Sequence, residues 1–185
     1  MVAYTKIEFK KRDIRLKDIP KFYQGLVENK VSVGVHKEQG SHNVDKAFWN
    51  EFGGGTFTLA TPMRKKKADG TWVRLEAGTT LRMPARPFIR LTLRPENMKL
   101  IRDCYLSKIN DVFQNGLKKP KANAREVLNE VGEGGQVAQW TNMEEWTTKL
   151  PNAPLTVAIK GFNHPLFDTG KMFNAIKYKV KKYNG

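Results

Sequence analysis

The triplet Asp168-Thr169-Gly170 has the residue types of an aspartic protease active site. That chemistry needs two such aspartates side by side, because two carboxylates at short range share one proton. The chain contains one such triplet, so a homodimer would be required. The residues that follow, 171–176, have the apolar spacing of a helix, where a protease would continue as an apolar strand. We therefore interpret Asp168 as a helix N-cap whose carboxylate accepts backbone N–H groups.

The other side chains that could do chemistry are scattered along the chain. His36, His42 and His164 lack the spacing of zinc ligands on a helix, and one cysteine cannot supply a Cys pair. That cysteine, Cys104, lies near the apolar stripe of a predicted helix, which favours a buried thiol over a nucleophile. The run Gly53–Gly55 lacks the Lys-Ser/Thr of a phosphate-binding loop. We therefore predict no enzyme, no cofactor and no metal site.

The strongest candidate for a binding function is the basic run 64–67. Adjacent cations on a projecting loop can lie against phosphates or against an acidic protein surface, although a charge run is often only a solvated surface. Asp69-Gly70 is a hairpin turn signal, and 71–75 alternate like a returning strand, so the run belongs to a basic hairpin. An exposed tryptophan in that strand can also anchor a protein interface. Partner or DNA contacts are predicted at Arg64, Lys65, Lys66, Lys67, Trp72 and Arg74.

The charge of the chain is unevenly distributed. The 185 residues include 33 Lys and Arg against 18 Asp and Glu, a formal net charge of +15. Residues 61–102 carry 11 basic and 3 acidic side chains, and both ends are basic, whereas 103–148 carry 5 basic and 7 acidic ones. A basic excess favours a polyanion or a strongly acidic partner. No helix-turn-helix, zinc finger or aromatic sheet motif predicts sequence-specific reading of nucleic acid.

The composition also indicates where the protein resides. No apolar run approaches the ~18 residues that a membrane helix needs. The first residues alternate polar and apolar and lack a hydrophobic signal core. A single cysteine excludes an internal disulfide framework and fits a reducing compartment. We expect a soluble intracellular protein with no membrane partner.

The elements that position these residues predict an α+β fold: a small antiparallel or mixed sheet packed by one long and several short helices. We expect a single domain, 1–185, with an N-terminal arm at 1–17 and a projecting basic loop at 56–85. The best helix covers 95–115, where apolar residues follow three-four spacing. Shorter helices are expected at 18–29 (capped by Asp18), 44–52, 123–131, 136–149 and 168–176, with glycines 132, 134 and 135 as an interruption. Further strands are expected at 4–9, 31–36, 56–59, 155–159 and 178–182.

Three ordered segments carry a family resemblance. They are the strand 31–35 with the helix end 48–53, the segment 83–90 that leads directly into the long helix, and 165–170 followed by a short helix. Together they resemble the tail-completion and neck proteins of long-tailed bacteriophages over most of residues 31–180. The framework positions that carry this resemblance are Glu51, Phe52, Gly53, Pro84, Arg86, Pro87, Phe88, Pro165, Leu166, Asp168, Thr169 and Gly170.

These positions also have physical roles in the prediction. Pro84 and Pro87 hold the residues before them extended, because proline disfavours the α conformation of its predecessor. Phe88 and Ile89 are then expected to enter the core just before the long helix. Gly53 and Gly170 are expected to supply chain reversals. The N-terminal 30 residues and the basic segment 61–82 depart from the family pattern.

The resemblance implies a structural virion protein that completes the tail and joins the tail tube to the head connector. It implies a ring of copies of this chain, with sixfold stoichiometry from the tail's symmetry, around the channel through which DNA passes. The implied partners are a head connector or stopper protein, a tail terminator or tail tube protein, and nonspecifically the packaged DNA. The implied location is the virion neck, and the host cytoplasm during assembly. Two other hypotheses stay open: a nonspecific nucleic-acid-binding protein with no virion role, and the homodimeric protease.

Overall fold

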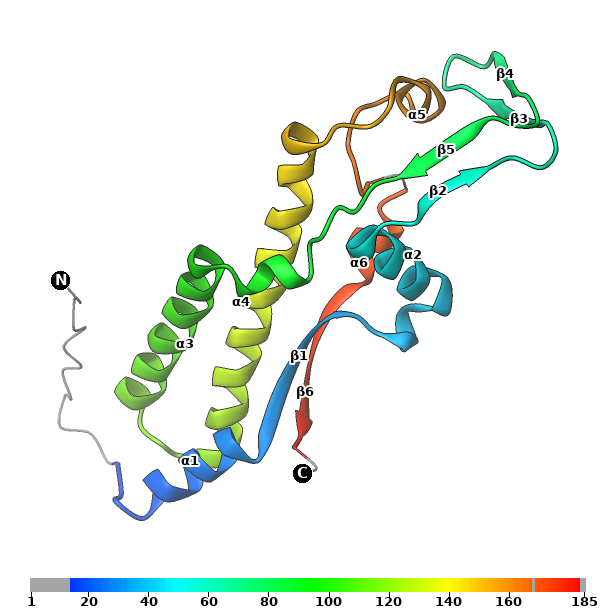
Figure 1. Cartoon of the computed structure of the whole chain (residues 1–185). Coiled ribbons are helices and arrows are strands. Elements are labelled where there is room, and N and C mark those ends of the chain that lie inside the picture. Colours follow the sequence, from blue (N-terminus) through cyan, green and yellow to red (C-terminus); the bar gives the residue numbers. More distant parts are fainter. Residues whose placement is uncertain (1–13, 168, 184–185) are drawn as a thin grey trace. The chain divides into compact units, whose positions relative to one another are not determined.

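The computed structural model describes residues 14–167 and 169–183, and it has the predicted α+β fold, with 54% helix and 18% strand (Figure 1). The strand expected at 4–9 and most of the N-terminal arm 1–17 lie outside the described residues. The helices are α1 Asp18–Val27, α2 Ser41–Phe52, α3 Pro95–Asn115, α4 Pro120–Lys149, α5 Pro154–Lys160 and α6 Lys171–Ala175. The strands are β1 Asn29–Val35, β2 Gly55–Thr58, β3 Met63–Lys66, β4 Trp72–Leu75, β5 Thr80–Met83 and β6 Ile176–Lys182.

Among the described residues, the strands form three separate two-stranded sheets, β1 with β6, β2 with β5 and β3 with β4. The chain divides into two compact units, and β1, α4 and β6 each run from one unit into the other. The first unit comprises 1–33, 94–136 and 178–185, and the second comprises 34–93 and 137–177. The expectation of a single domain stays a prediction.

The first unit is built from α1, α3 and the beginning of α4. Its core contains Phe22, Val112, Leu117, Ala124 and Val127, with the ring of Phe22 edge-on to that of Phe113 at 5.6 Å between centroids. The apolar stripe of α3 packs into this core. The helix has the bounds predicted from that stripe, 95–115.

The start of α1 differs from the prediction. Asp18 is the first helical residue, and the N-cap position belongs to Lys17. The Asp18 carboxylate is buried, and it accepts a hydrogen bond from Nε of Arg15 at 2.7 Å. A buried carboxylate needs such a partner, so Asp18 closes the turn before the helix through its ion pair.

Helix α4 corrects the largest error of the sequence prediction, because it continues from Pro120 to Lys149 without a break. Its glycines are sites of close packing within the first unit. A Cβ at Gly132 would lie 2.4 Å from Cδ2 of Tyr178, and one at Gly135 would lie 2.9 Å from Cγ2 of Val33. The glycines cost helix propensity but let β-strand side chains approach the helix backbone.

The strand expected at 155–159 is also wrong, because these residues form helix α5. Pro154 occupies the first helical turn, and Gly161 follows the helix in the left-handed conformation, which is the usual order of these residues at helix ends. A short apolar run does not distinguish strand from helix by periodicity. The helix expected from 168 begins at Lys171 with Gly170 at its N-cap, and Asp168 lies outside the described residues.

The packing at α4 predicts that Gly132→Ala destabilises the protein, although alanine is the better helix former. The new methyl group would meet the base of the Tyr178 ring, which cannot move as the end of a flexible side chain can. We expect the free energy of unfolding in urea to fall by about 1–3 kcal/mol. Gly134→Ala is the matched control, because its Cβ would lie 3.2 Å from Sγ of Cys104 and needs only a small adjustment. A Gly132→Ala protein more stable than the wild type would contradict this packing.

Candidate functional site

The predicted basic hairpin is part of a longer element, which we call the basic arm, residues 55–83. It consists of two antiparallel ladders in succession, β2 with β5 and β3 with β4 (Figure 1). The turn between β3 and β4 is closed by the Lys67 N–H, which donates to the Thr71 carbonyl at 2.8 Å. The Thr71 hydroxyl and N–H both donate to the Asp69 carboxylate, and these bonds, the hydroxyl's first, lower the pKa of Asp69.

The register of the second ladder sorts the predicted contact residues onto two faces. Arg64 pairs with Arg74, and Lys66 pairs with Trp72. Directly opposed residues share a face, and alternate residues of one strand share it too, so these four side chains lie together. Lys65 pairs with Val73 on the other face. The structure therefore brings four of the six predicted contact residues together.

The tip of the basic arm is bound to helix α5. The Ala68 N–H donates to the Ala158 carbonyl at 3.0 Å. The two chains approach closely here, since a Cβ at Gly161 would lie 2.8 Å from Cβ of Ala68. Helix α5 therefore contributes to the site through the Ala158 carbonyl.

The base of the basic arm passes tightly against the end of α2. The Gly54 N–H donates to the Met83 carbonyl at 3.0 Å. Gly53 has φ +84°, and a Cβ there would lie 3.0 Å from the Ala85 nitrogen, so both its backbone conformation and its surroundings require glycine. Gly53 thus reverses the chain as the sequence predicts.

Glu51 at the end of α2 anchors the segment that follows the basic arm. Its buried carboxylate accepts the backbone N–H groups of Phe88, Ile89 and Arg90 at 2.8, 2.9 and 3.1 Å. Nε of Arg90 lies 3.5 Å from the same carboxylate. Bonds of N–H groups to an ionised oxygen are stronger than neutral ones, and this carboxylate holds three consecutive residues. Glu51, from the first of the three motif segments, therefore holds the second segment, 83–90, in place through hydrogen bonds.

Helix α4 also binds this segment, through two residues that were not predicted from the sequence. Nδ2 of the fully buried Asn142 donates to the Phe88 carbonyl at 2.9 Å. Nε1 of Trp146 donates to the Pro87 carbonyl at 2.9 Å. The signal in the sequence was their spacing, because residues four apart share a helix face. It was weak, since an asparagine on a helix ordinarily faces solvent.

Arg86 completes this set of contacts. Its N–H donates to the Asn50 carbonyl at 2.7 Å, and its guanidinium donates to the carbonyls of Leu150 and Pro151 at 3.1 and 3.2 Å. Burial lowers the pKa of Arg86 below its ordinary value. Its side chain therefore serves the framework of the second unit.

All three motif segments contribute to one hydrophobic core in the second unit. Phe88 is fully buried there beside Ala47, Met143, Met172 and Ile176, and Leu166 packs against them. The remaining framework positions lie differently: Pro84 and Pro87 are half-buried, Pro165 and Gly170 are buried, Phe52 and Thr169 are exposed, and Asp168 lies outside the described residues.

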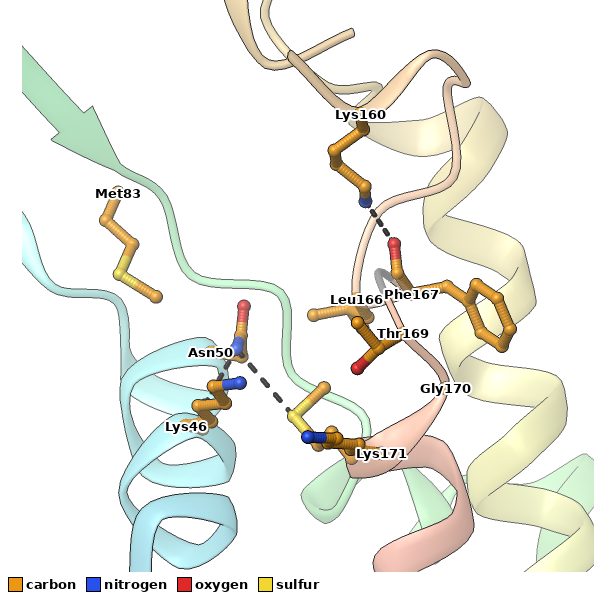
Figure 2. Close-up of a pocket in the computed structure, with 10 residues that line it drawn as sticks. Lys46, Asn50, Met83, Lys160, Leu166, Phe167, Thr169, Gly170 and Lys171 are labelled. Carbon is orange, nitrogen blue, oxygen red and sulfur yellow. Dashed lines mark hydrogen bonds between the residues drawn. The ribbon is translucent and has the colours of Figure 1, made fainter. Parts of the chain in front are cut away.

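A cavity of about 270 Å³ lies where α2 meets the loop before α6 (Figure 2). Lys46, Lys160 and Lys171 contribute to its lining, together with apolar side chains. The Lys160 ammonium is already engaged, since it donates to the carbonyls of His164 and Phe167. The described lining residues include no His, Cys, Asp or Glu, so the polar groups at the cavity are lysine ammonium groups, the Asn50 amide and the Thr169 hydroxyl.

The Cys104 thiol and the His164 imidazole, which the sequence offered as reactive groups, each have neighbours that account for them without catalysis. Burial, followed by the nearby Glu130, raises the pKa of the Cys104 thiol. Nε2 of His164 lies 2.7 Å from the Glu144 carboxylate. Within residues 14–167 and 169–183, no three His, Cys, Asp or Glu side chains gather as a metal site. The helices of this part of the chain are too short or too polar to cross a membrane.

No family model, curated protein or solved structure matches the chain.

The geometry around Glu51 predicts that Glu51→Gln destabilises the protein. An amide has one acceptor oxygen, so its NH₂ group would face backbone donors and leave at least one of them unsatisfied. We expect the free energy of unfolding to fall by about 2 kcal/mol or more. Asp45→Asn, on an exposed position of the same helix, is the matched control and should change it by less than about 0.5 kcal/mol. Equal urea midpoints for the two variants would refute the anchoring role.

Proposed function

We propose that this chain is a structural protein of the bacteriophage neck. Copies of it form a ring that completes the tail and joins the tail tube to the head connector around the DNA channel. The proposal begins from the three ordered motifs of the tail-completion and neck proteins. It is supported by the contacts of those motifs, since Glu51, Phe88 and Leu166 belong to one framework and core.

The observation that carries the proposal is the incomplete state of the basic arm. An isolated two-stranded ladder is marginally stable in water, and the arm consists of two of them in succession. Leu59 is the one hydrophobic side chain of the described arm that is buried, whereas Phe57 and Trp72 are 49% and 64% exposed. In the described part of the chain, each arm strand pairs on one side only. Such edges are completed when a second chain adds a strand.

A second surface on the same unit supports a ring. The exposed ring of Phe48 on α2 contacts the exposed rings of Trp49 and Phe52, and we call these three residues the aromatic surface. They adjoin a groove of about 340 Å³ that is lined mainly by apolar side chains. Repeated head-to-tail contacts need two different surfaces on each subunit, and the basic arm and the aromatic surface are different. The sixfold stoichiometry rests on the resemblance alone.

Disruption of the gene in the phage genome that carries it tests the proposal. We expect negative-stain images to show filled heads and tails that are not joined, with loss of infectious particles. A nonspecific nucleic-acid-binding protein with no virion role would leave joined particles intact. Normal yields of joined, infectious phage would therefore overturn the proposal.

The aromatic surface makes a sharper prediction in the same system. Complementation with Phe48→Ser and Phe52→Ser together should restore few joined particles, because the contact surface between subunits becomes polar. The matched control replaces Tyr23 and Val27 by serine on α1, where they are 65% and 53% exposed. Both doubles should fold, as judged by far-UV circular dichroism. Full complementation by the α2 variant, or equal loss with both, would remove this surface from the ring contact.

A further inference from the structure

One face of the second ladder in the basic arm is almost entirely cationic. Arg64, Lys66, Arg74 and Trp72 share it by register, and all four are exposed. The opposite face carries Met63, Lys65, Val73 and Leu75, of which all but Lys65 are half-buried. The ladder therefore turns Met63, Val73 and Leu75 one way and three of its four cations the other way. We call the second side the cationic face.

The like charges of the cationic face lower the stability of the isolated ladder. Arg64 lies directly opposite Arg74, and like charges in that position destabilise a pair of strands. Arg74 is paired with Glu76 at 2.8 Å, but both side chains are more than half exposed, so the pair contributes little. The other acidic group of the arm, Asp69, accepts hydrogen bonds from Thr71 at the turn. An external anion would remove the repulsion.

We propose that the cationic face binds the phosphate backbone of double-stranded DNA without reading its sequence. Arg64, Lys66 and Arg74 would each neutralise a phosphate. The inference rests on the proposed function, in which the basic arm stands in a ring around DNA, and it names which face of the arm meets the DNA. The ties of the arm at Ala68 and at Gly54 hold this face in place before it binds.

Two alternative partners fit the cationic face less well. Protein interfaces are enriched in Arg and Trp but depleted in Lys and in unpaired charge at their cores, so only a strongly acidic protein would fit this face. Surfaces that bind single strands stack successive bases on several aromatic rings, and this face carries one, Trp72. Duplex phosphates need only cations at regular intervals, and alternate residues of a strand repeat about every 6.6 Å.

The test uses the purified full-length chain and a short fluorescent duplex, with binding followed by anisotropy over a range of salt concentrations. Each neutralised phosphate contributes about −0.9 to the log–log slope of affinity against salt. The triple variant Arg64→Ala, Lys66→Ala and Arg74→Ala should weaken binding about tenfold or more at low salt and make the slope shallower by about 2–3. The matched control replaces Lys118, Lys119 and Lys121 by alanine, which removes the same charge from the first unit.

The possible outcomes separate the alternatives. The proposal is supported if the triple variant of the arm binds DNA more weakly and with a shallower salt dependence, while the control variant keeps most of the wild-type affinity and slope. Both variants should unfold at the same urea concentration as the wild type. Equal losses in the two triples would assign binding to total charge and overturn it. Tighter binding to the matching single strand, or binding to polyglutamate and not to duplex, would overturn it as well. Because no virion is involved, this result is independent of the gene-disruption experiment.

Discussion

The second unit depends on one buried carboxylate. Glu51 is the penultimate residue of α2, and its carboxylate accepts three consecutive N–H groups from 88–90, so it stabilises a segment that belongs to no strand or α-helix. A lone buried carboxylate would be costly, but three donors and the nearby Arg90 compensate for its loss of water. Asn142 and Trp146 bind the carbonyls of the same segment from α4. Donors and acceptors of this extended segment are thereby paired from two helices.

The position of this anchor determines what the basic arm can do. The arm leaves the framework immediately after α2 and returns at Met83, just before the anchored segment. Its base is therefore fixed by Gly53 and Gly54 against 83–85, and its tip is held at Ala158. Between these ties it is two narrow ladders with little buried apolar area. A rigidly based but incomplete β-element suits assembly with another chain, because little order has to be gained on binding.

The sequence predicted the parts of this structure whose signals are local. The apolar stripe of α3, the turn at Asp69-Gly70 and the fold class were all correct, because spacing and turn residues determine them. The sequence prediction failed where contacts between residues far apart in the chain determine the local structure. Gly132 looks like a helix end until Tyr178 is seen against it, and the run 155–159 looks like a strand until Pro154 and Gly161 bound it as a helix. Asn142 gave only a weak signal, because its partner is a backbone carbonyl 54 residues away.

The proposed function requires that the basic arm be an assembly element completed by a second chain. Amide hydrogen exchange, measured by mass spectrometry on residues 55–83, tests it most directly when the free chain is compared with the chain incorporated in phage particles. In the free chain, the arm amides should exchange much faster than those of α4, because local stability follows buried contacts. In the particle, they should become protected. Arm amides that exchange equally fast in both states would contradict the account.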